Sequence, residues 1–339
     1  MKANGLKFLF LLIVLLSILA FSESYYTPLY LKTPKGWPKP QYDFSKNPLT
    51  EEGFQLGKIL FYDPILSRDN TISCSSCHLQ QTGFTHVDHE LSHGIESKVG
   101  TRNSLTLQNL AWTKNFMWDG GVNHLDVQAI GPITSADEMD ESLQNVVAKL
   151  QKSDKYPALF EKAFKTKKIT GQLTLKAISQ FVVSLTSSNS KYDKVARKEE
   201  QFTAMEQKGY NLFKTNCASC HKEPLFTSDN FENNGLDVDN TLNDIGRMKI
   251  TKNSKDSLKF KVPTLRNVQF TFPYMHDGRF KTLNEVVKHY NSLQKKSNLS
   301  KELSNPMQLS DNERTELVAF LKTLTDKEFL FNPRFSYPK

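Results

Sequence analysis

The placement of the cysteines constrains this chain more than any other feature. Its 339 residues contain four cysteines, and all four fall in two C-x-x-C-H segments, "CSSCH" at 74–78 and "CASCH" at 217–221. This pattern attaches c-type haem: each thiol forms a thioether, and the adjacent histidine becomes the proximal ligand of the iron. The predicted attachment residues are Cys74, Cys77 and His78 for one haem, and Cys217, Cys220 and His221 for the other.

Structural disulfides and a zinc site are the alternative uses of four cysteines, and both fit this pattern less well. Structural disulfides need no histidine after each pair, and a bridge within C-x-x-C closes so small a loop that it adds little stability. A zinc site would need cysteine and histidine side chains that converge on one metal. Two copies of the full pattern therefore predict two covalently bound haems.

The N-terminus has the layout of a secretory signal. Lys2 and Lys7 precede an uninterrupted apolar run from Phe8 to Phe21, which is typical of a signal peptide. We expect residues 1–22 to direct export to the periplasm. The run is shorter than the about 20 apolar residues of a spanning helix, which favours a signal peptide over a membrane anchor. An uncleaved anchor is the alternative, because no A-x-A cleavage site follows the run.

The formal net charge is +8, which weakly suggests an acidic partner or an anionic surface. The lysines are scattered, and no basic stripe with interleaved aromatics indicates nucleic acid. Nucleic-acid binding is therefore not expected.

The two haem segments resemble an internal duplication, because each follows an amphipathic pattern with a glycine and a Leu-Phe pair. In the first copy, Thr50 is a candidate N-cap and Asp63-Pro64 a candidate helix end. Later segments also show apolar residues at helical spacing, and no convincing strand alternation is present. The predicted fold is mainly α, with two cytochrome c-type haem domains packed face to face.

The polar stretch 187–201 is the weakest pattern between the two halves, so the boundary is placed there. We predict an N-terminal haem domain over 40–195 and a C-terminal haem domain over 196–339. The aromatic tail is a candidate to pack back on the first domain.

The segment between the haem motifs, "FMWDGGVNHLDVQAIGPITSADEMD" at 116–140, closely resembles the bacterial di-haem cytochrome c peroxidase family, including its MauG-type branch. The later segment "FKVPTLRNVQFTFPYMHDGRF" carries the V-P-T-L-R-N and H-D-G runs of the same family. The resemblance extends from about Thr50 to Thr323, and it implies that the N-terminal haem domain is peroxidatic and that the C-terminal one transfers electrons.

The resemblance implies three catalytic residues. Trp118, Gln128 and Glu138 stand at the family's spacing, 10 residues apart in each step. Glu138 would move a proton between the oxygens of bound peroxide, and Gln128 would orient peroxide or water. Trp118 would carry an electron between the haems.

The resemblance also implies sixth ligands for the haem irons. Typical members have a distal histidine on the first haem, and His93 lies nearest that place, although the family's G-H order is reversed here to "SHG". MauG-type members lack this ligand. A metal site formed by His86, His89 and His93 is the alternative use of these histidines.

On the second haem, typical members use a methionine fourteen residues after the histidine of H-D-G, whereas MauG-type members have a tyrosine. Counting from His276 gives Tyr290, which is the predicted ligand; Met275 and His289 are neighbouring rivals. An anionic oxygen ligand stabilises oxidised iron, whereas methionine raises the potential.

The family further implies one calcium ion between the domains. Its matching oxygen donors are the side chain of Asn103 and the backbone carbonyls of Thr271 and Pro273.

The function predicted is reduction of H2O2 to water with electrons from a small redox protein, either a cytochrome c or a cupredoxin. One alternative is a MauG-type enzyme that uses H2O2 to oxidise side chains of a partner protein. The other is a di-haem electron carrier without catalysis. Relatives often dimerise, so a homodimer is a candidate assembly.

Overall fold

The computed structural model describes residues 26–294, 298–305 and 307–338. The predicted signal or anchor segment lies outside these residues. The described chain is mainly helical, as the sequence predicts. Its helices are α2 (Glu51–Tyr62), α3 (Cys74–Cys77), α4 (Leu125–Gln128), α5 (Ile130–Thr134), α6 (Leu143–Lys152), α7 (Tyr156–Phe164), α8 (Gly171–Val183), α9 (Lys191–Ala196), α10 (Ala204–Asn216), α11 (Met248–Thr251), α12 (Leu283–Asn291), α13 (Asp311–Lys322) and α14 (Lys327–Leu330). Two short antiparallel strands pair with each other, β1 (Phe231–Glu232) and β2 (Phe260–Lys261).

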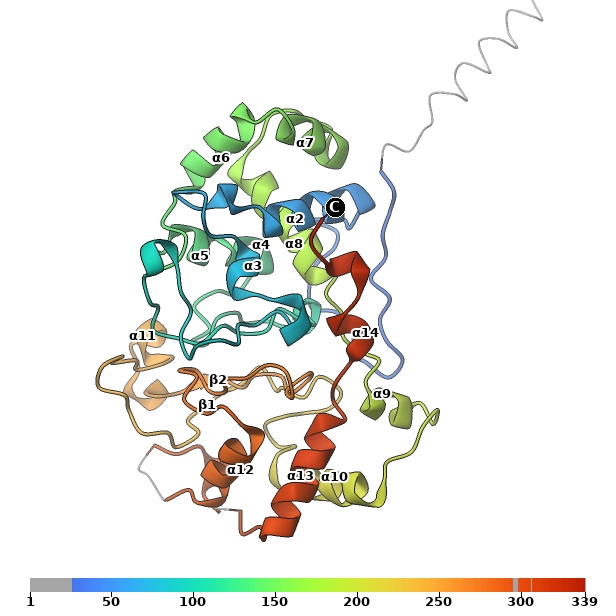
Figure 1. Ribbon diagram of the computed structural model, residues 1–339, viewed down its shortest axis with the longest axis vertical. Helices are drawn as coiled ribbons and strands as arrows, with labels where there is room; N and C mark the ends of the chain where they lie inside the picture. Colours follow the sequence, from blue (N-terminus) through green and yellow to red (C-terminus); the bar gives the residue numbers. More distant parts are fainter. Residues whose placement is uncertain (1–25, 295–297, 306, 339) are drawn as a thin grey trace, which may run out of the picture.

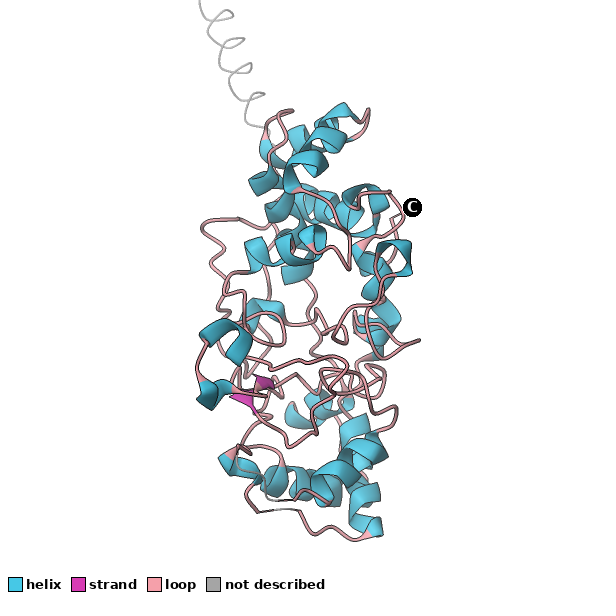
Figure 2. Ribbon diagram, turned by 90° about the vertical axis from the view of Figure 1, so that its left-hand side faces the viewer, coloured by secondary structure: helices cyan, strands magenta, loops and turns pink. Residues whose placement is uncertain are grey.

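The helices form two units stacked along the long axis (Figure 1). The first unit holds α2 to α8 and the second holds α10 to α13. Figure 2 shows helices gathered at the two ends, with loops forming much of the layer between them. Within the described parts of the chain, no helix has the length and apolar character to cross a membrane.

Each unit is built on the same helix crossing. In the first unit α2 crosses α8 so closely that a Cβ on Gly57 would lie 1.9 Å from the carbonyl oxygen of Ala177. In the second unit α10 crosses α13, and a Cβ on Gly209 would lie 1.9 Å from the carbonyl oxygen of Glu316. Only glycine allows two backbones to approach this closely. The repeated crossing supports the internal duplication that the sequence suggests.

The helix ends follow from local chemistry. The Thr50 hydroxyl accepts a hydrogen bond from the backbone N–H of Gly53 and caps α2, and Asp63 ends that helix. Both assignments were predicted from the sequence. An N-cap hydroxyl satisfies a backbone donor that has no partner within the helix.

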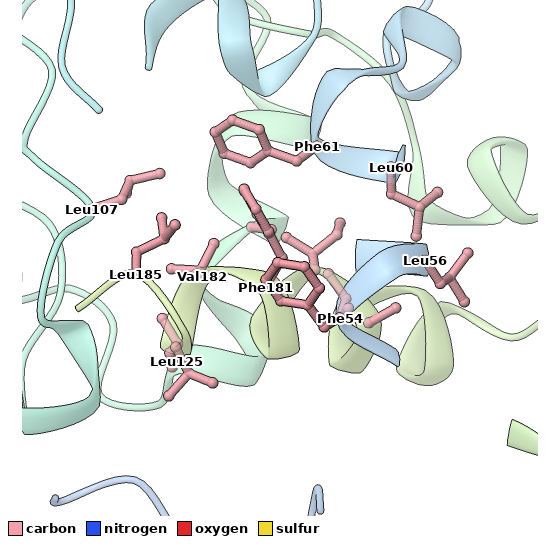
Figure 3. Packing of buried hydrophobic residues seen from close by; sticks show 14 of the residues in the cluster. Phe54, Leu56, Leu60, Phe61, Leu107, Leu125, Phe181, Val182 and Leu185 are labelled. Carbon is pink, nitrogen blue, oxygen red and sulfur yellow. The ribbon is translucent and has the colours of Figure 1, made fainter. Parts of the chain in front are cut away.

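The core of the first unit lies between α2 and α8. Figure 3 shows Phe54 and Phe61 of α2 facing Phe181 of α8. The ring centroids of Phe61 and Phe181 are 5.0 Å apart. The second unit repeats this arrangement, because the ring centroids of Phe213 and Phe320 are 5.1 Å apart.

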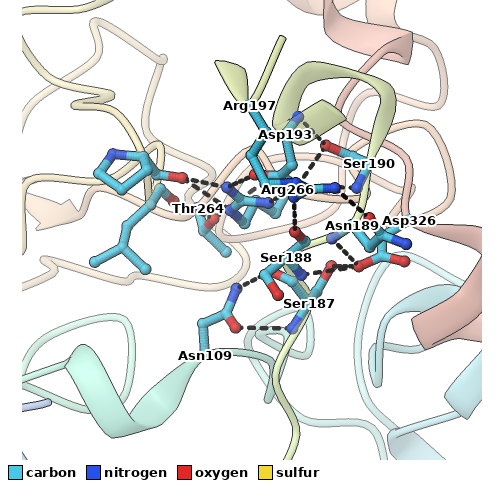
Figure 4. A network of polar contacts seen from close by, with 12 residues as sticks. Asn109, Ser187, Ser188, Asn189, Ser190, Asp193, Arg197, Thr264, Arg266 and Asp326 are labelled. Atoms are coloured by element: carbon cyan, nitrogen blue, oxygen red, sulfur yellow. Dashed lines mark hydrogen bonds and ion pairs between the residues drawn. The ribbon is translucent and has the colours of Figure 1, made fainter. Parts of the chain in front are cut away.

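A buried polar network joins the two units (Figure 4). Arg266 is fully buried and donates two hydrogen bonds to the Asp193 carboxylate, at 2.9 and 2.8 Å. Asp326 accepts from the hydroxyl of Ser187 at 3.0 Å, and its own backbone N–H donates to Asn267 at 2.7 Å. A buried charge is tolerated only when it is paired and hydrogen-bonded, so this network fixes how the linker meets the second unit.

Residues near the predicted boundary pack with the second unit. Tyr192 of α9 belongs to the core that contains Phe213 and Phe320. The boundary at 195/196 stays a prediction. The packing places α9 with the second unit, although most of this helix precedes the predicted boundary.

The C-terminal tail returns to the first unit (Figure 1). Phe329 and Phe335 lie in the first core, and the hydroxyl of Tyr62 donates to the carbonyl oxygen of Phe335 at 2.7 Å. The tail therefore ties the last helices to α2.

Candidate functional site

The first C-x-x-C-H segment forms a single helical turn. In α3 the backbone N–H of His78 donates to the carbonyl oxygen of Cys74 at 3.0 Å, which places Cys74 and Cys77 on one face. His78 Nδ1 lies 2.8 Å from the carbonyl oxygen of Phe84. A carbonyl can only accept, so Nδ1 carries the proton and the lone pair of Nε2 is available for iron.

The second segment repeats this geometry. The backbone N–H of His221 donates to the carbonyl oxygen of Cys217 at 2.9 Å. His221 Nδ1 lies 3.1 Å from the carbonyl oxygens of both Phe226 and Pro263. Nε2 is again left as the iron-binding atom.

The charge states suit covalent haem rather than a disulfide or a thiolate metal site. None of the four cysteines forms a disulfide with another. Burial raises the pKa of Cys74 to about 12 and that of Cys77 to about 11. Burial also lowers the pKa of His78 to about 4 and lowers that of His221. Both histidines are therefore neutral at pH 7, the form that binds metal.

A cavity of about 200 Å³ lies above the second attachment turn. Its wall includes the attachment residues Cys217, Cys220 and His221, and otherwise consists largely of apolar side chains. An apolar cavity with two thiols and an imidazole on its wall fits a covalently attached haem.

Tyr290 and Met275 also line this cavity. Burial raises the pKa of Tyr290 to about 12, against the opposing effect of a hydrogen bond with Asn234. His289 Nε2 lies 2.9 Å from the carbonyl oxygen of Asn234 and is engaged there. Of the three candidate ligands, the structure thus brings Tyr290 and Met275 to the cavity.

Trp118 lies where the two units meet. It is 8% exposed, and its indole N–H donates to the carbonyl oxygen of Asn103 at 2.8 Å. Its own carbonyl accepts from the backbone N–H of Lys261 in β2 at 2.7 Å. The indole lines the second cavity and stands 6.5 Å from the His276 ring. Trp118 is thus placed between the first unit and the second haem cavity.

Glu138 lies beside the first attachment turn. Its carboxylate is close enough to influence the pKa of both Cys74 and Cys77. Burial raises the pKa of Glu138, and the negative charge of Asp137 adds to the rise. The Glu138 carbonyl accepts from the backbone N–H of Ile95 at 2.8 Å, which fixes the turn that carries it.

Gln128 ends α4, and its amide contacts the sulfur of Met117 at 3.7 Å. Met117 directly precedes Trp118 in the sequence. Gln128 is therefore tied to the Trp118 segment rather than to the segment of Glu138.

His93 lies next to the same turn through its backbone. Cys77 Sγ lies 3.4 Å from the backbone carbonyl oxygen of His93. The His93 ring stands 4.0 Å from the ring of His89.

The three residues predicted to hold calcium, Asn103, Thr271 and Pro273, all line the second cavity. The amide of Asn103 donates to the carbonyl of Glu90 at 2.9 Å. The structure therefore brings the three residues to the same cavity.

Comparison with known proteins agrees with this geometry. Residues 51–201 match the family model described as di-haem cytochrome c peroxidase, and residues 206–325 match that of cytochrome c. The methylamine utilization protein MauG of Methylorubrum extorquens is 37% identical over 86% of this chain and 82% of that protein. The cytochrome c551 peroxidase of Nitrosomonas europaea is 34% identical over 84% of this chain and 82% of that protein.

The chain belongs to the di-haem cytochrome c peroxidase family. Its members are peroxidases that carry two covalently bound c-type haems, as the cysteine pattern predicts. A solved structure described as a MauG-like protein associated with microbial copper homeostasis is also similar. It has a TM-score of 0.83 and 32% sequence identity, and the match covers 91% of this chain and 99% of that one.

Sequence reasoning missed a structural equivalence within this di-haem peroxidase. Asn109 and Asn267 both have positive φ, of 60° and 58°. Nine residues after each of them stand Trp118 and His276, and their rings meet across the unit interface. The shared "T-L-x-N" and "M-x-D-G" letters could have revealed this equivalence, because they recur at the same spacing in the two halves.

Sequence reasoning also missed a triad of ion-paired residues that includes Asp119, the residue after Trp118. Arg102 pairs with Asp119 at 2.7 Å and with Asp244 at 2.6 Å, and so joins the two units beside the indole. No motif marks this triad, since its members are far apart in the chain.

Proposed function

We propose that this chain reduces H2O2 at the first haem, that Glu138 transfers the proton, and that a small cytochrome c or cupredoxin supplies the electrons. The balanced reaction consumes one H2O2, two protons and two electrons and releases two molecules of water. The observation that carries the proposal is the position of Glu138: a carboxyl with a raised pKa stands beside the first attachment turn.

The bound haem would supply the redox chemistry, with His78 holding the iron of the first haem and His221 that of the second. Glu138 then accepts a proton from one peroxide oxygen and returns it to the other. A carboxyl whose pKa is raised toward neutral suits both directions of this transfer. General acid–base help of this kind contributes about 10²–10⁴-fold in rate.

Other residues would position the reactants. We assign Gln128 to orient peroxide or water by hydrogen bonding. Trp118 is assigned to electron transfer between the haems, a role supported by its place on the wall of the second cavity.

Steady-state oxidation of a reduced cytochrome c by H2O2 tests the proposal. We expect Glu138→Gln to lower turnover by about 10²–10⁴-fold while both haems remain bound. Glu161→Gln is the matched control, because Glu161 is exposed on α7, and this variant should keep wild-type turnover. Wild-type turnover in Glu138→Gln would refute the role of Glu138. If the wild type and both variants transfer electrons but none of them consumes peroxide, the chain is an electron carrier.

A second candidate is MauG-type oxidation of a partner protein, and Tyr290 favours it. The phenol lines the second cavity together with His221. We assign Tyr290 as the sixth ligand of that haem. An oxygen ligand stabilises oxidised iron and makes the haem a poor acceptor of electrons from a cytochrome.

Mixing H2O2 with fully oxidised and with half-reduced protein separates the two candidates. Rapid reaction of the oxidised form would support the MauG-type candidate and an open first haem. Reaction only after one-electron reduction would support a distal ligand, His93, that must leave the iron first.

We further propose one Ca²⁺ between the units, held by Asn103 and by the carbonyls of Thr271 and Pro273. Their shared place in the lining of the second cavity supports it. Export to the periplasm and assembly as a homodimer complete the proposal.

A further inference from the structure

Three histidines close to one another follow the first attachment segment. The ring centroids of His86 and His89 are 4.2 Å apart, and those of His89 and His93 are 4.0 Å apart. We call His86, His89 and His93 the histidine row. Its members come from one short stretch, spaced His-x2-His-x3-His.

Two nitrogen atoms of the row lack hydrogen-bond partners. Among buried side-chain polar atoms in the described residues, three have no partner, and two of these are His86 Nδ1 and His89 Nδ1. His86 is itself only 5% exposed. A buried polar atom without a partner costs about 1–3 kcal/mol, and a bound ion is one of the few explanations for such an atom.

The backbone holds both ends of the row in place. The backbone N–H of Leu79 donates to the carbonyl of Thr85 at 2.8 Å, directly before His86. After the row, the N–H of Gly94 donates to the carbonyl of Lys98 at 2.8 Å. Asn103 fastens the middle of the segment through the Glu90 carbonyl at 2.9 Å. The three imidazoles are therefore kept together before any ligand arrives.

We propose that the histidine row binds one divalent late transition metal ion, Zn²⁺ or Cu²⁺, separately from the two haem irons. Imidazole is a preferred ligand of both ions. A three-histidine site leaves a fourth position for water. Asp88 and Glu90 lie within the same segment and add negative charge near a cation.

Binding requires a small rearrangement of the rings. Among the described residues, the group whose donor atoms all lie within 4.8 Å of one another is Cys220, Glu232 and Glu302, and its thiol is used for haem attachment. The donor atoms of the three histidines do not all lie this close to one another, so the rings must turn toward a common point to reach the about 2.0–2.1 Å of a Zn–N bond. Turning the rings would also let the two nitrogens without hydrogen-bond partners bind the ion.

The site has a structural link to the first haem. His93 contributes a ring to the row, and its carbonyl oxygen lies 3.4 Å from Cys77 Sγ. The next residue, Gly94, packs so tightly against Glu138 that a Cβ there would meet its backbone at 2.4 Å. Metal in the row would stiffen this segment, but binding itself does not depend on the proposed peroxidase function.

Calorimetric titration of the di-haem protein with Zn²⁺ tests the proposal, with Cu²⁺ and EPR as a second probe. We expect one saturable equivalent and, with Cu²⁺, hyperfine splitting from imidazole nitrogens. His89→Ala should abolish this binding, and His89→Gln is a second variant in case the first loses haem. His124→Ala is the matched control, because His124 is exposed on another part of the surface.

Saturable binding that survives in both His89 variants would overturn the proposal, as would no binding by the wild type. It is also overturned if His93→Ala changes the EPR signal of the first haem in metal-free protein, because His93 would then be an iron ligand.

Discussion

The close crossing of α10 and α13 can be tested by a single added methyl group. A Cβ at position 209 would lie 1.9 Å from the carbonyl oxygen of Glu316 and 2.9 Å from the Cβ of Phe320. The helices must separate by about 1.1 Å before the first contact reaches 3.0 Å. Overpacking of this kind costs about 1–3 kcal/mol, occasionally more.

Helix propensity alone predicts the opposite sign for Gly209→Ala. Alanine is favoured over glycine inside a helix by about 1 kcal/mol. If the clash costs about 3 kcal/mol, the net loss is about 2 kcal/mol. That loss corresponds to a fall of about 4–8 °C in the Tm of a unit of this size.

Thermal unfolding of the haem-loaded protein, followed by circular dichroism and by the haem absorbance, measures this change. Asn211→Ala is the control, because Asn211 is an exposed position on the same helix and the change should leave Tm the same or slightly higher. Gly57→Ala makes the equivalent change in the first unit and should give a similar loss. A Gly209→Ala protein as stable as the wild type would refute the close crossing.

Three further predictions concern the site. Asp137→Asn removes a charge that raises the pKa of Glu138, so this pKa should fall and the Glu138-dependent limb of the pH–rate profile should move to lower pH; an unmoved or alkaline-shifted limb would count against the assignment. Tyr290→Phe should change the EPR spectrum of the second haem and leave that of the first as it was, and an unchanged spectrum would rule out the phenol as ligand. Trp118→Phe leaves the Asn103 carbonyl without its indole donor, which should lower the free energy of unfolding by about 1–3 kcal/mol in denaturant titrations; no loss would contradict the buried hydrogen bond.

The haem attachment residues were predictable because their chemistry is local. Two thiols and a histidine within five residues form a single helical turn, and the spacing alone places both thiols on one face. The cap at Thr50 and the helix end at Asp63 were equally local. Such features need no knowledge of distant contacts.

The unit interface could not be predicted in this way. Arg266 and Asp193 form a buried pair although 73 residues separate them, and neither lies in a pattern that indicates burial. The partner of the Trp118 indole is a backbone carbonyl, and backbone acceptors leave no mark in a sequence. The same applies to the carbonyls of Thr271 and Pro273, which we propose as calcium donors.

The role of Glu138 in proton transfer can be tested through the bimolecular rate constant of the first reaction with H2O2 under single-turnover conditions. Stopped-flow absorbance on haem-loaded wild type and Glu138→Gln gives this rate without involving the electron donor. If Glu138 transfers the proton, the variant should keep both haems and react about 10²–10⁴-fold more slowly. A variant that reacts with peroxide as fast as the wild type would contradict the central claim that Glu138 transfers the proton.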